Sequence, residues 1–168
     1  MDFIKRNKFE ITFISVLLMI SIIFYTNFST IFVSGSSMSP TFEDKDIVIL
    51  NKDKNIKRNQ IAVFVPPQDW DSTSKAYVKR IVAIEEDTIQ IVENNLYVNG
   101  FFHSDVSGYN CDFVDIVEKI PAGYVFLMGD NYGYSHDSMN RLCEHNSFLV
   151  ETKNIEVSGE KYRKLGGF

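Results

Sequence analysis

The chain has 168 residues, enough for one folded domain with a sizeable core and too few for a comfortable pair of domains. Hydrophobic residues make up 45% and charged residues 23%, a balance that excludes a disordered or fibrous chain. The formal net charge of −5 argues against a duplex nucleic-acid binder, because such proteins need a basic surface.

The first 33 residues have the pattern of a membrane anchor. Residues 1–10 contain the cations Lys5, Arg6 and Lys8, whereas residues 11–33 carry no charge. A helix of 23 residues is about 34 Å long, enough to cross a hydrocarbon core of about 30 Å. A cleavable secretory signal also starts with basic residues, but no small-x-small cleavage site follows this apolar run. We therefore expect a cytoplasmic tail (1–10), a transmembrane anchor (11–33) and an extracytoplasmic domain (34–168), oriented by the positive-inside rule.

The domain at 34–168 is predicted to be mainly β. Short apolar runs of strand length alternate with polar turns, and helical periodicity is absent until residues 147–153. Asn99-Gly100, between two apolar runs, predicts a two-residue type I′ hairpin. The expected strands cover residues 47–50, 61–65, 76–84, 89–92, 96–98, 113–117 and 124–128.

A serine-rich loop and a lysine-bearing strand are candidates for a nucleophile and its base. Residues 35–41 read Gly-Ser-Ser-Met-Ser-Pro-Thr, where glycine permits a tight turn and proline fixes the next bend. A serine needs a base to act as a nucleophile. In residues 77–84 the period-2 alternation places Lys79 and Arg80 on opposite faces, and only the lysine can lose its proton when burial lowers its pKa. Without a partner serine, Lys79 extending to solvent from an edge strand is an equally good interpretation.

A third segment, 121–140, runs from a turn through an apolar strand into a polar loop that can fix the geometry of a site. Ser135-His136-Asp137 has the composition of a hydrolase triad, but adjacent side chains point in different directions and cannot align for that chemistry. The three histidines lack metal-ligand spacing, so neither a metal nor another cofactor is expected. Cys111 and Cys143 either form a disulfide or remain two buried thiols.

In this order, after an amino-terminal anchor, the three segments resemble type I signal peptidases (leader peptidases) of the single-span kind found in Gram-positive bacteria. The resemblance covers nearly the whole chain and includes Ser-Met-x-Pro-Thr at 37–41, Lys-Arg at 79–80 and Met-Gly-Asp-Asn at 128–131. It implies the mainly β signal-peptidase fold, with Ser37 as the nucleophile and Lys79 as the general base. It also implies that Ser135 hydrogen-bonds the lysine and that Asp137 stabilises the last segment.

The resemblance further implies a plasma-membrane serine endopeptidase that removes signal peptides from secretory preproteins by acyl transfer. The preprotein would bind as an extended strand, with small side chains in shallow apolar pockets. Membrane lipid would be a second partner, because the hydrophobic segment of the substrate lies in the same bilayer. The backbone N–H of Ser37 would be one oxyanion donor. The family often takes another from the residue two before the nucleophile, which here is Gly35 and has no hydroxyl.

Several positions depart from the family pattern. An expected Arg-Gly-Asp, Pro-Gly-Asp and Asn-Arg-Asp are replaced at 58–60, 85–87 and 131–133. An expected arginine is replaced by Met139, which removes an ion pair with Asp137 that Arg141 could restore. Because Ser37 and Lys79 are retained, we expect an active but specialised enzyme with restricted substrates.

Signal-peptidase-like proteins of pilus assembly show similar divergence, and some of them have lost catalysis. The competing interpretation is therefore an anchored assembly factor that holds a pilin precursor or another surface protein without cutting it. A third interpretation is a membrane-tethered structural β domain without a site.

Overall fold

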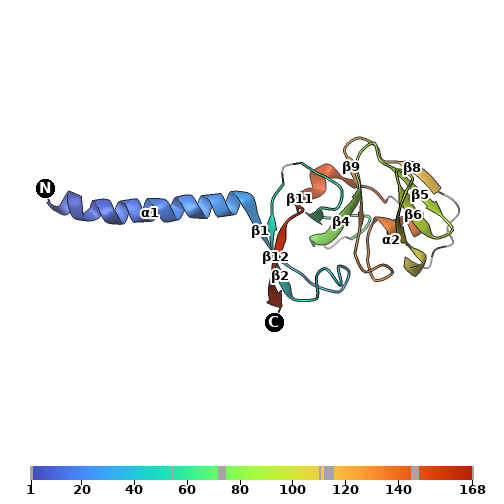
Figure 1. Ribbon diagram of the computed structural model, residues 1–168, viewed down its shortest axis with the longest axis horizontal. Coiled ribbons are helices and arrows are strands. Elements are labelled where there is room, and N and C mark those ends of the chain that lie inside the picture. Colours follow the sequence, from blue (N-terminus) through green and yellow to red (C-terminus); the bar gives the residue numbers. More distant parts are fainter. Residues whose placement is uncertain are drawn as a thin grey trace.

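The structure, a computed structural model, consists of one long helix and a β domain with three antiparallel sheets (Figure 1). It describes residues 2–53, 55–71, 75–109, 111, 116–144 and 148–167. The helices are α1 (Asp2–Asn27) and α2 (Ser138–Cys143), and the short 3-10 turns are η1 (Ser107–Tyr109) and η2 (Thr152–Asn154). The strands are β1 (Phe28–Phe32), β2 (Asp46–Asn51), β3 (Ile61–Phe64), β4 (Tyr77–Ala83), β5 (Thr88–Val92), β6 (Asn95–Val98), β7 (Phe101–Asp105), β8 (Ile116–Lys119), β9 (Tyr124–Met128), β10 (Val150–Glu151), β11 (Ile155–Gly159) and β12 (Tyr162–Gly167).

Helix α1 ends six residues before the boundary expected from the sequence. Its residues Lys8–Asn27 are long and apolar enough to cross a membrane, and none of this stretch is buried inside the structure. The segment Phe28–Phe32, which we expected within the anchor, instead forms β1 and pairs with β2. Aromatic and β-branched residues favour strands, and pairing with β2 satisfies backbone groups that a helix would otherwise bond internally. The expected boundary of the helix at 33 is therefore corrected to 27.

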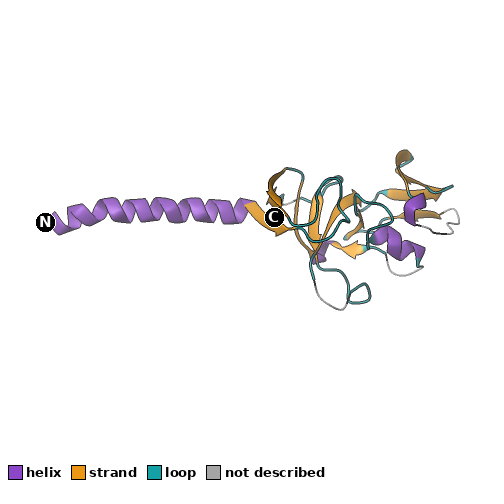
Figure 2. Ribbon diagram, turned by 90° about the horizontal axis from the view of Figure 1, so that it is seen from below, coloured by secondary structure: helices purple, strands orange, loops and turns teal. Residues whose placement is uncertain are grey.

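The three sheets follow one another away from the helix. The sheet β1-β2-β12 lies where α1 joins the domain (Figure 2), and the end of β12 pairs with the start of β2, away from the junction. The central sheet has the order β10-β9-β4-β3-β11, and the sheet β7-β6-β5-β8 lies at the far end of the domain (Figure 1). A mainly β fold with an amino-terminal apolar helix is thus confirmed.

Most strand predictions are confirmed, including the hairpin between β6 and β7. Asn99 and Gly100 have φ of +53° and +80°, both in the left-handed region that a type I′ turn requires. The predicted strand 113–117 is described only at 116–117, within β8, and its first three residues lie outside the described part.

The predicted helix at 147–153 is wrong over its described residues. Val150 and Glu151 form β10 by pairing with β9, and a 3-10 turn follows at 152–154. The helix of this region is α2, whose first three residues lie in the segment that we expected to be a polar loop, and six residues are too few to show a helical pattern. Its start depends on Asp137, whose carboxylate caps the helix by accepting bonds from the backbone N–H groups of Met139 and Asn140.

A hydrophobic cluster beneath the serine-rich loop fixes the position of that loop. Met38 and Phe42 are fully buried against Val48, Leu50 and Ile61 of the neighbouring strands. Burial of two large side chains so close to Ser37 holds the backbone in place without using the Ser37 side chain. The fold therefore leaves the hydroxyl free to face the central sheet.

Candidate active site

Ser37 and Lys79 lie in contact although they are 42 residues apart in the chain. Lys79 Nζ donates a hydrogen bond of 2.7 Å to Ser37 Oγ. Lys79 belongs to β4 and Ser37 to the loop after β1, so the contact joins the central sheet to the first sheet. A hydroxyl at this distance from an amine can transfer its proton directly once the amine is neutral.

The environment of Lys79 favours its neutral form. The residue is 3% exposed, and burial lowers the pKa of its amine to about 8, with the carboxylates of Asp137 and Asp130 opposing the shift. The amine also lies 5.6 Å from the ring centre of Tyr77. A substantial fraction of the amine is therefore unprotonated in mildly alkaline solution, as general-base catalysis requires.

Arg80 lies on the opposite face of β4, as the alternation predicted, and binds the loop after β9. Its Nε and one terminal nitrogen donate to the two carboxylate oxygens of Asp130, at 2.8 and 2.6 Å. This bidentate pair raises the pKa of the guanidinium further. Arg80 also donates to the backbone carbonyl of Asn59, so one side chain connects β4, the turn before β3 and the loop after β9.

The loop after β9 binds the backbone of the serine-rich loop. The N–H of Asn131 donates to the Ser37 carbonyl at 3.0 Å, and its side-chain amide donates to the Ser36 carbonyl at the same distance. Gly129 fits closely against this contact, because a Cβ there would overlap Ser135 Oγ and the Ser37 carbonyl oxygen. Only glycine at 129 permits this approach of the two loops.

Ser135 is buried beside Gly129, but its expected hydrogen bond to the lysine is not formed. Its Oγ has no hydrogen-bond partner within the part of the chain that the structure describes. The lysine donates instead to Ser37, which faces it across the site. The placement of Ser135 near the dyad agrees with the expectation, whereas the contact that we assigned to it does not.

Asp137 is fully buried and binds four neutral donors. Its Oδ1 caps α2, and its Oδ2 accepts from the Tyr109 hydroxyl at 2.9 Å and from the Gly129 N–H at 2.8 Å. Arg141, which we considered as a replacement cation, instead pairs with Asp69 and Glu144. That suggestion is wrong because Arg141 follows Asp137 by one helical turn and points toward other carboxylates. Among the described residues Asp137 thus accepts hydrogen bonds from neutral donors and forms no ion pair.

Gly35 and His136, which the sequence also pointed to, have their hydrogen-bonding groups engaged by other residues. Gly35 has φ of +86°, and its N–H donates to the Asp44 carboxylate at 2.7 Å, so this backbone group is already engaged. His136 has its Nε2 at 3.3 Å from the Trp70 carbonyl, and the Asp137 carboxylate points elsewhere, so these neighbours form no triad. Among the described residues no group of three or more His, Cys, Asp or Glu could hold a metal ion.

A cavity of about 290 Å³ opens beside the dyad. Its lining consists of Phe32, Val33, Ser34, Ser37, Met38, Lys75, Ala76, Tyr77, Val78, Lys79 and His136. Two of its walls are extended backbone with one side unpaired among the described residues. Phe32–Ser34 continue from β1, which is an edge strand, and β4 pairs with β9 only from Arg80 onward. The cavity can therefore accept an extended peptide between these walls.

Comparison with known proteins decides the family. Residues 6–155 match the model of a family described as signal peptidase, peptidase S26. The chain belongs to this signal peptidase family. It is 33% identical over 132 residues to a signal peptidase I of Bacillus amyloliquefaciens, a match that covers 68% of this chain and 67% of that protein.

Two further signal peptidases are similar to the chain. Signal peptidase I V of Bacillus subtilis (strain 168) is 33% identical over 125 residues, which cover 63% of this chain and 71% of that one. A crystal structure of a signal peptidase I from Enterococcus faecalis V583 aligns with a TM-score of 0.44 and 20% identity, over 62% of this chain and 96% of that one. The family assignment depends on the sequence matches. The chain is accordingly a peptidase of this family.

The structure adds functional candidates that the sequence analysis did not single out. Arg80 with Asp130, Asn131 and Gly129 hold the two loops together, and their only signal was their place in the family motifs. Tyr109 lies in a segment that matches no motif, so nothing in the sequence pointed to it. Cys111 and Cys143 form a disulfide, which decides between the two alternatives left open by the sequence.

Proposed function

We propose that this signal peptidase is a membrane-bound serine endopeptidase that removes signal peptides from exported preproteins with a Ser37/Lys79 dyad. The observation that carries the proposal is the 2.7 Å contact between the Ser37 hydroxyl and a lysine amine that is buried and has a lowered pKa. A lysine exposed at an edge strand would keep its proton near neutral pH, so the alternative of a solvated side chain has lost its support.

The proposed reaction is acyl transfer in two steps. Neutral Lys79 takes the hydroxyl proton while Ser37 Oγ adds to the scissile carbonyl carbon, and the resulting ammonium then gives that proton to the leaving amine. The product is an ester between Ser37 and the signal peptide. Lys79 next takes a proton from water, the hydroxide attacks the ester, and the proton returns to Ser37 Oγ. The Ser37 N–H is the proposed backbone donor to the oxyanion.

The proposed substrate is a preprotein segment that lies extended in the cavity. The outer edge of Phe32–Ser34 on one wall and the edge of Tyr77–Lys79 opposite β3 on the other supply partners for main-chain hydrogen bonds. Val33, Met38, Ala76 and Val78 make parts of the lining apolar, which suits small apolar side chains next to the cleaved bond.

The membrane anchor in this proposal is α1. Its 20 residues Lys8–Asn27 correspond to about 30 Å of helix, which matches the hydrocarbon thickness. The cations at 5, 6 and 8 favour a cytoplasmic amino terminus, with the β domain outside the cytoplasm. Because Ser37 follows the end of α1 by only ten residues, the dyad stays near the membrane that also holds the substrate.

The second candidate is an assembly factor that binds a pilin precursor, or another surface protein, without cutting it. One observation favours it, namely that within the described part of the chain Asp137 binds neutral donors alone, where the family pattern has an ion pair. The contact between Ser37 and Lys79 counts against it, because a protein that only binds its partner would not need a buried lysine with a lowered pKa.

The test is cleavage of a purified preprotein by the full-length protein in detergent, followed by mass spectrometry of the products. We expect wild type to cut at one site, and Ser37→Ala and Lys79→Ala to lose at least 10³-fold in kcat, as when a nucleophile or its base is removed. Ser36→Ala and Lys119→Ala are matched controls, since both positions are exposed and lie outside the dyad. Binding of the preprotein without cleavage by wild type would favour the assembly factor, and equal cleavage by all five proteins would exclude the dyad.

A further inference from the structure

The segment between β7 and β8 begins against the loop that connects β9 to α2. We call Ser107–Tyr109 together with Cys111 the buttress. Its first contact is between backbones, because a Cβ on Gly133 would overlap the Gly108 carbonyl. The loop that connects β9 to α2 therefore lies against the buttress with no room for a side chain at 133.

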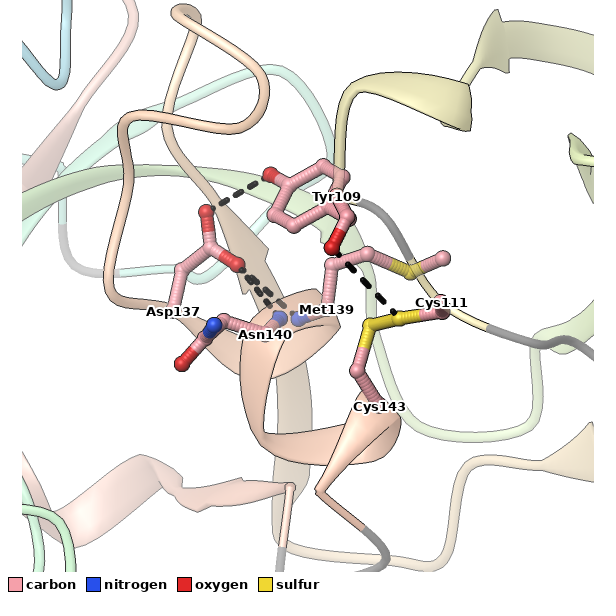
Figure 3. The surroundings of a disulfide bond; sticks show 6 residues. All are labelled: Tyr109, Cys111, Asp137, Met139, Asn140 and Cys143. Carbon is pink, nitrogen blue, oxygen red and sulfur yellow. Dashed lines mark hydrogen bonds between the residues drawn. A yellow bond between two sulfur atoms is a disulfide. The ribbon is translucent and has the colours of Figure 1, made fainter.

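The second contact is a buried hydrogen bond from Tyr109 to Asp137. The Tyr109 side chain is nearly fully buried, and its hydroxyl donates to Asp137 Oδ2 at 2.9 Å (Figure 3). Burial and the neighbouring Asp137 carboxylate raise the pKa of the phenol well above its usual range, so the hydroxyl keeps its proton and remains a donor. One of the four hydrogen bonds to the Asp137 carboxylate therefore comes from a residue outside the segment between β9 and α2.

The third contact is covalent. Cys111 follows Tyr109 by two residues, and its disulfide partner Cys143 is the last residue of α2, the helix that Asp137 caps (Figure 3). The hydrogen bond thus joins the buttress to the start of α2 and the disulfide joins it to the end. Two connections at opposite ends of one helix prevent the buttress from sliding along α2 or turning away from it.

Asp137 passes this constraint on to the dyad. The oxygen that accepts from Tyr109 also accepts from the Gly129 N–H, and Gly129 lies against the Ser37 carbonyl. The carboxylate also acts on the charge of Lys79, whose other charged neighbour is Asp130, itself paired with Arg80. Among the described residues, Tyr77 on the same strand and His136 and Lys75 in the lining of the cavity are further titratable groups near the amine.

We propose that Tyr109, fixed by the Cys111–Cys143 disulfide, is a positioning residue that sets the placement of Asp137 and through it the alignment of Ser37 with Lys79. The inference rests on the dyad of the proposed function and goes beyond it. It makes catalysis dependent on the oxidised state of a disulfide that contains no catalytic group.

The test compares Tyr109→Phe with Tyr134→Phe in the full-length protein. Tyr134 is the matched control because it lies in the loop after β9 and its side chain is exposed. We expect Tyr109→Phe to lower kcat about three- to tenfold with little change in KM, as for the loss of one neutral hydrogen bond. Since the Asp137 charge would then be less dispersed, the alkaline rise of kcat should move upward by about 0.5 pH unit. At position 109 only tyrosine is expected to give the wild-type kcat.

The disulfide is tested in the same assay. Cys111→Ser with Cys143→Ser should lower kcat in the wild-type background and have a much smaller effect when added to Tyr109→Phe, because both changes release the same carboxylate. A purely stabilising role would lower the melting temperature of both variants and leave the pH profile of kcat unchanged. That result, or an equal shift in Tyr134→Phe, would overturn the inference.

A measurement that needs no cleavage separates this inference from the proposed function. The pKa of Lys79 can be read by NMR of protein with ¹³Cε-labelled lysine, assigned with Lys79→Ala. We expect a higher pKa in Tyr109→Phe than in wild type and no change in Tyr134→Phe. If Ser37→Ala still cuts the preprotein, the proposed dyad fails, and the titration alone then decides whether Tyr109 acts on Lys79; an unchanged pKa would exclude it.

Discussion

At the scale of single residues, the proposed mechanism depends on a lysine whose burial lowers its pKa. Lys79 lies among apolar neighbours of the central sheet and keeps one short contact, to Ser37. Arg80, the next residue, keeps its charge because Asp130 binds it with two hydrogen bonds. The alternation of a β-strand thus places one titrating and one permanently charged cation on opposite faces.

Lowering the pKa of a buried lysine costs folding stability, and this cost depends on pH. The unfolded chain holds the Lys79 proton up to about pH 10.5, whereas the folded protein releases it at about pH 8. Between these values the unfolded state binds more protons, so the stability of wild type rises with pH and the cost disappears above the unfolded pKa. Below pH 8 the full cost is present, about 3 kcal/mol for this shift.

We therefore predict that Lys79→Met is more stable than wild type at pH 7, by up to about 3 kcal/mol. The difference should shrink steadily between pH 8 and pH 10.5. Denaturant unfolding of both proteins at a series of pH values measures it. A difference that is constant with pH would mean that the amine is not desolvated in the folded state.

The second prediction at this scale concerns Gly129. Because a Cβ at this position would overlap Ser135 Oγ and the Ser37 carbonyl oxygen, Gly129→Ala should displace the nucleophile loop and lower kcat at least 100-fold. Tyr134→Ala is the control, since its side chain is exposed in the same loop. Near-wild-type kcat in Gly129→Ala would show that the two loops do not need this close approach.

At the scale of elements, the site is assembled from the central sheet, the first sheet and the segment that follows β9. β4 supplies the lysine, the loop after β1 supplies the serine, and the segment from β9 to α2 holds the two together through Gly129 and Asn131. The short helix α2 has little stability of its own, because six residues cannot repay the cost of nucleation. The cap at Asp137 and the disulfide at Cys143 stabilise this short helix at its two ends.

Removal of this disulfide should destabilise the domain measurably. The bridge closes a loop with a sequence separation of 32 residues, for which chain entropy gives about 3 to 4 kcal/mol. We predict that Cys111→Ser with Cys143→Ser lowers the free energy of unfolding by about that amount, and that dithiothreitol does the same to wild type. If neither treatment changes the unfolding midpoint, the two cysteines are not bridged in the folded protein.

Local sequence patterns predicted the parts of the fold that local physics determines. The Asn99-Gly100 hairpin and the two faces of the Lys79 strand follow from backbone preference and period alone. The strands β1 and β12 were missed because each exists only through pairing with β2, a contact between distant segments. Asn59, at φ of +68°, occupies a position where the family has glycine, and asparagine tolerates that conformation, so this departure is structurally mild.

The residues of the candidate site could likewise be predicted from the sequence only in part. Ser37 and Lys79 were predicted from a family resemblance, and their contact depends on a tertiary fold that no periodicity reveals. The roles expected for Ser135 and Arg141 failed because they transferred single contacts, which depend on side-chain geometry, from a pattern of residue types. Tyr109 was beyond sequence reasoning because its segment matches no motif and its role depends on a tertiary contact with Asp137.

At the scale of the whole molecule, the arrangement of the helix and the site supports the proposal that the substrate is itself held in a membrane. α1 leads directly into β1, and the sheet β1-β2-β12 lies between the helix and the rest of the domain (Figure 1). The backbone of Phe32–Ser34, which continues this sheet, forms one wall of the cavity. In the proposed function, a preprotein anchored by its own apolar segment would reach the dyad without leaving the bilayer.

The proposed orientation predicts which side of the membrane exposes the β domain. In right-side-out vesicles, added protease should degrade the domain and leave a small fragment that contains α1. Inside-out vesicles are the control and should protect the domain until detergent is added. Protection in right-side-out vesicles would place the β domain in the cytoplasm and reverse the topology.

The most direct test of the central claim is the pH dependence of a single turnover, in which excess enzyme cuts a preprotein once. The account predicts that the rate rises with pH and levels off with an apparent pKa near 8, because only neutral Lys79 can take the Ser37 proton. Lys79→Ala should show no such rise. A rate that is flat from pH 6 to pH 10, or that rises only near the pKa of a free lysine, about 10.4, would contradict the account.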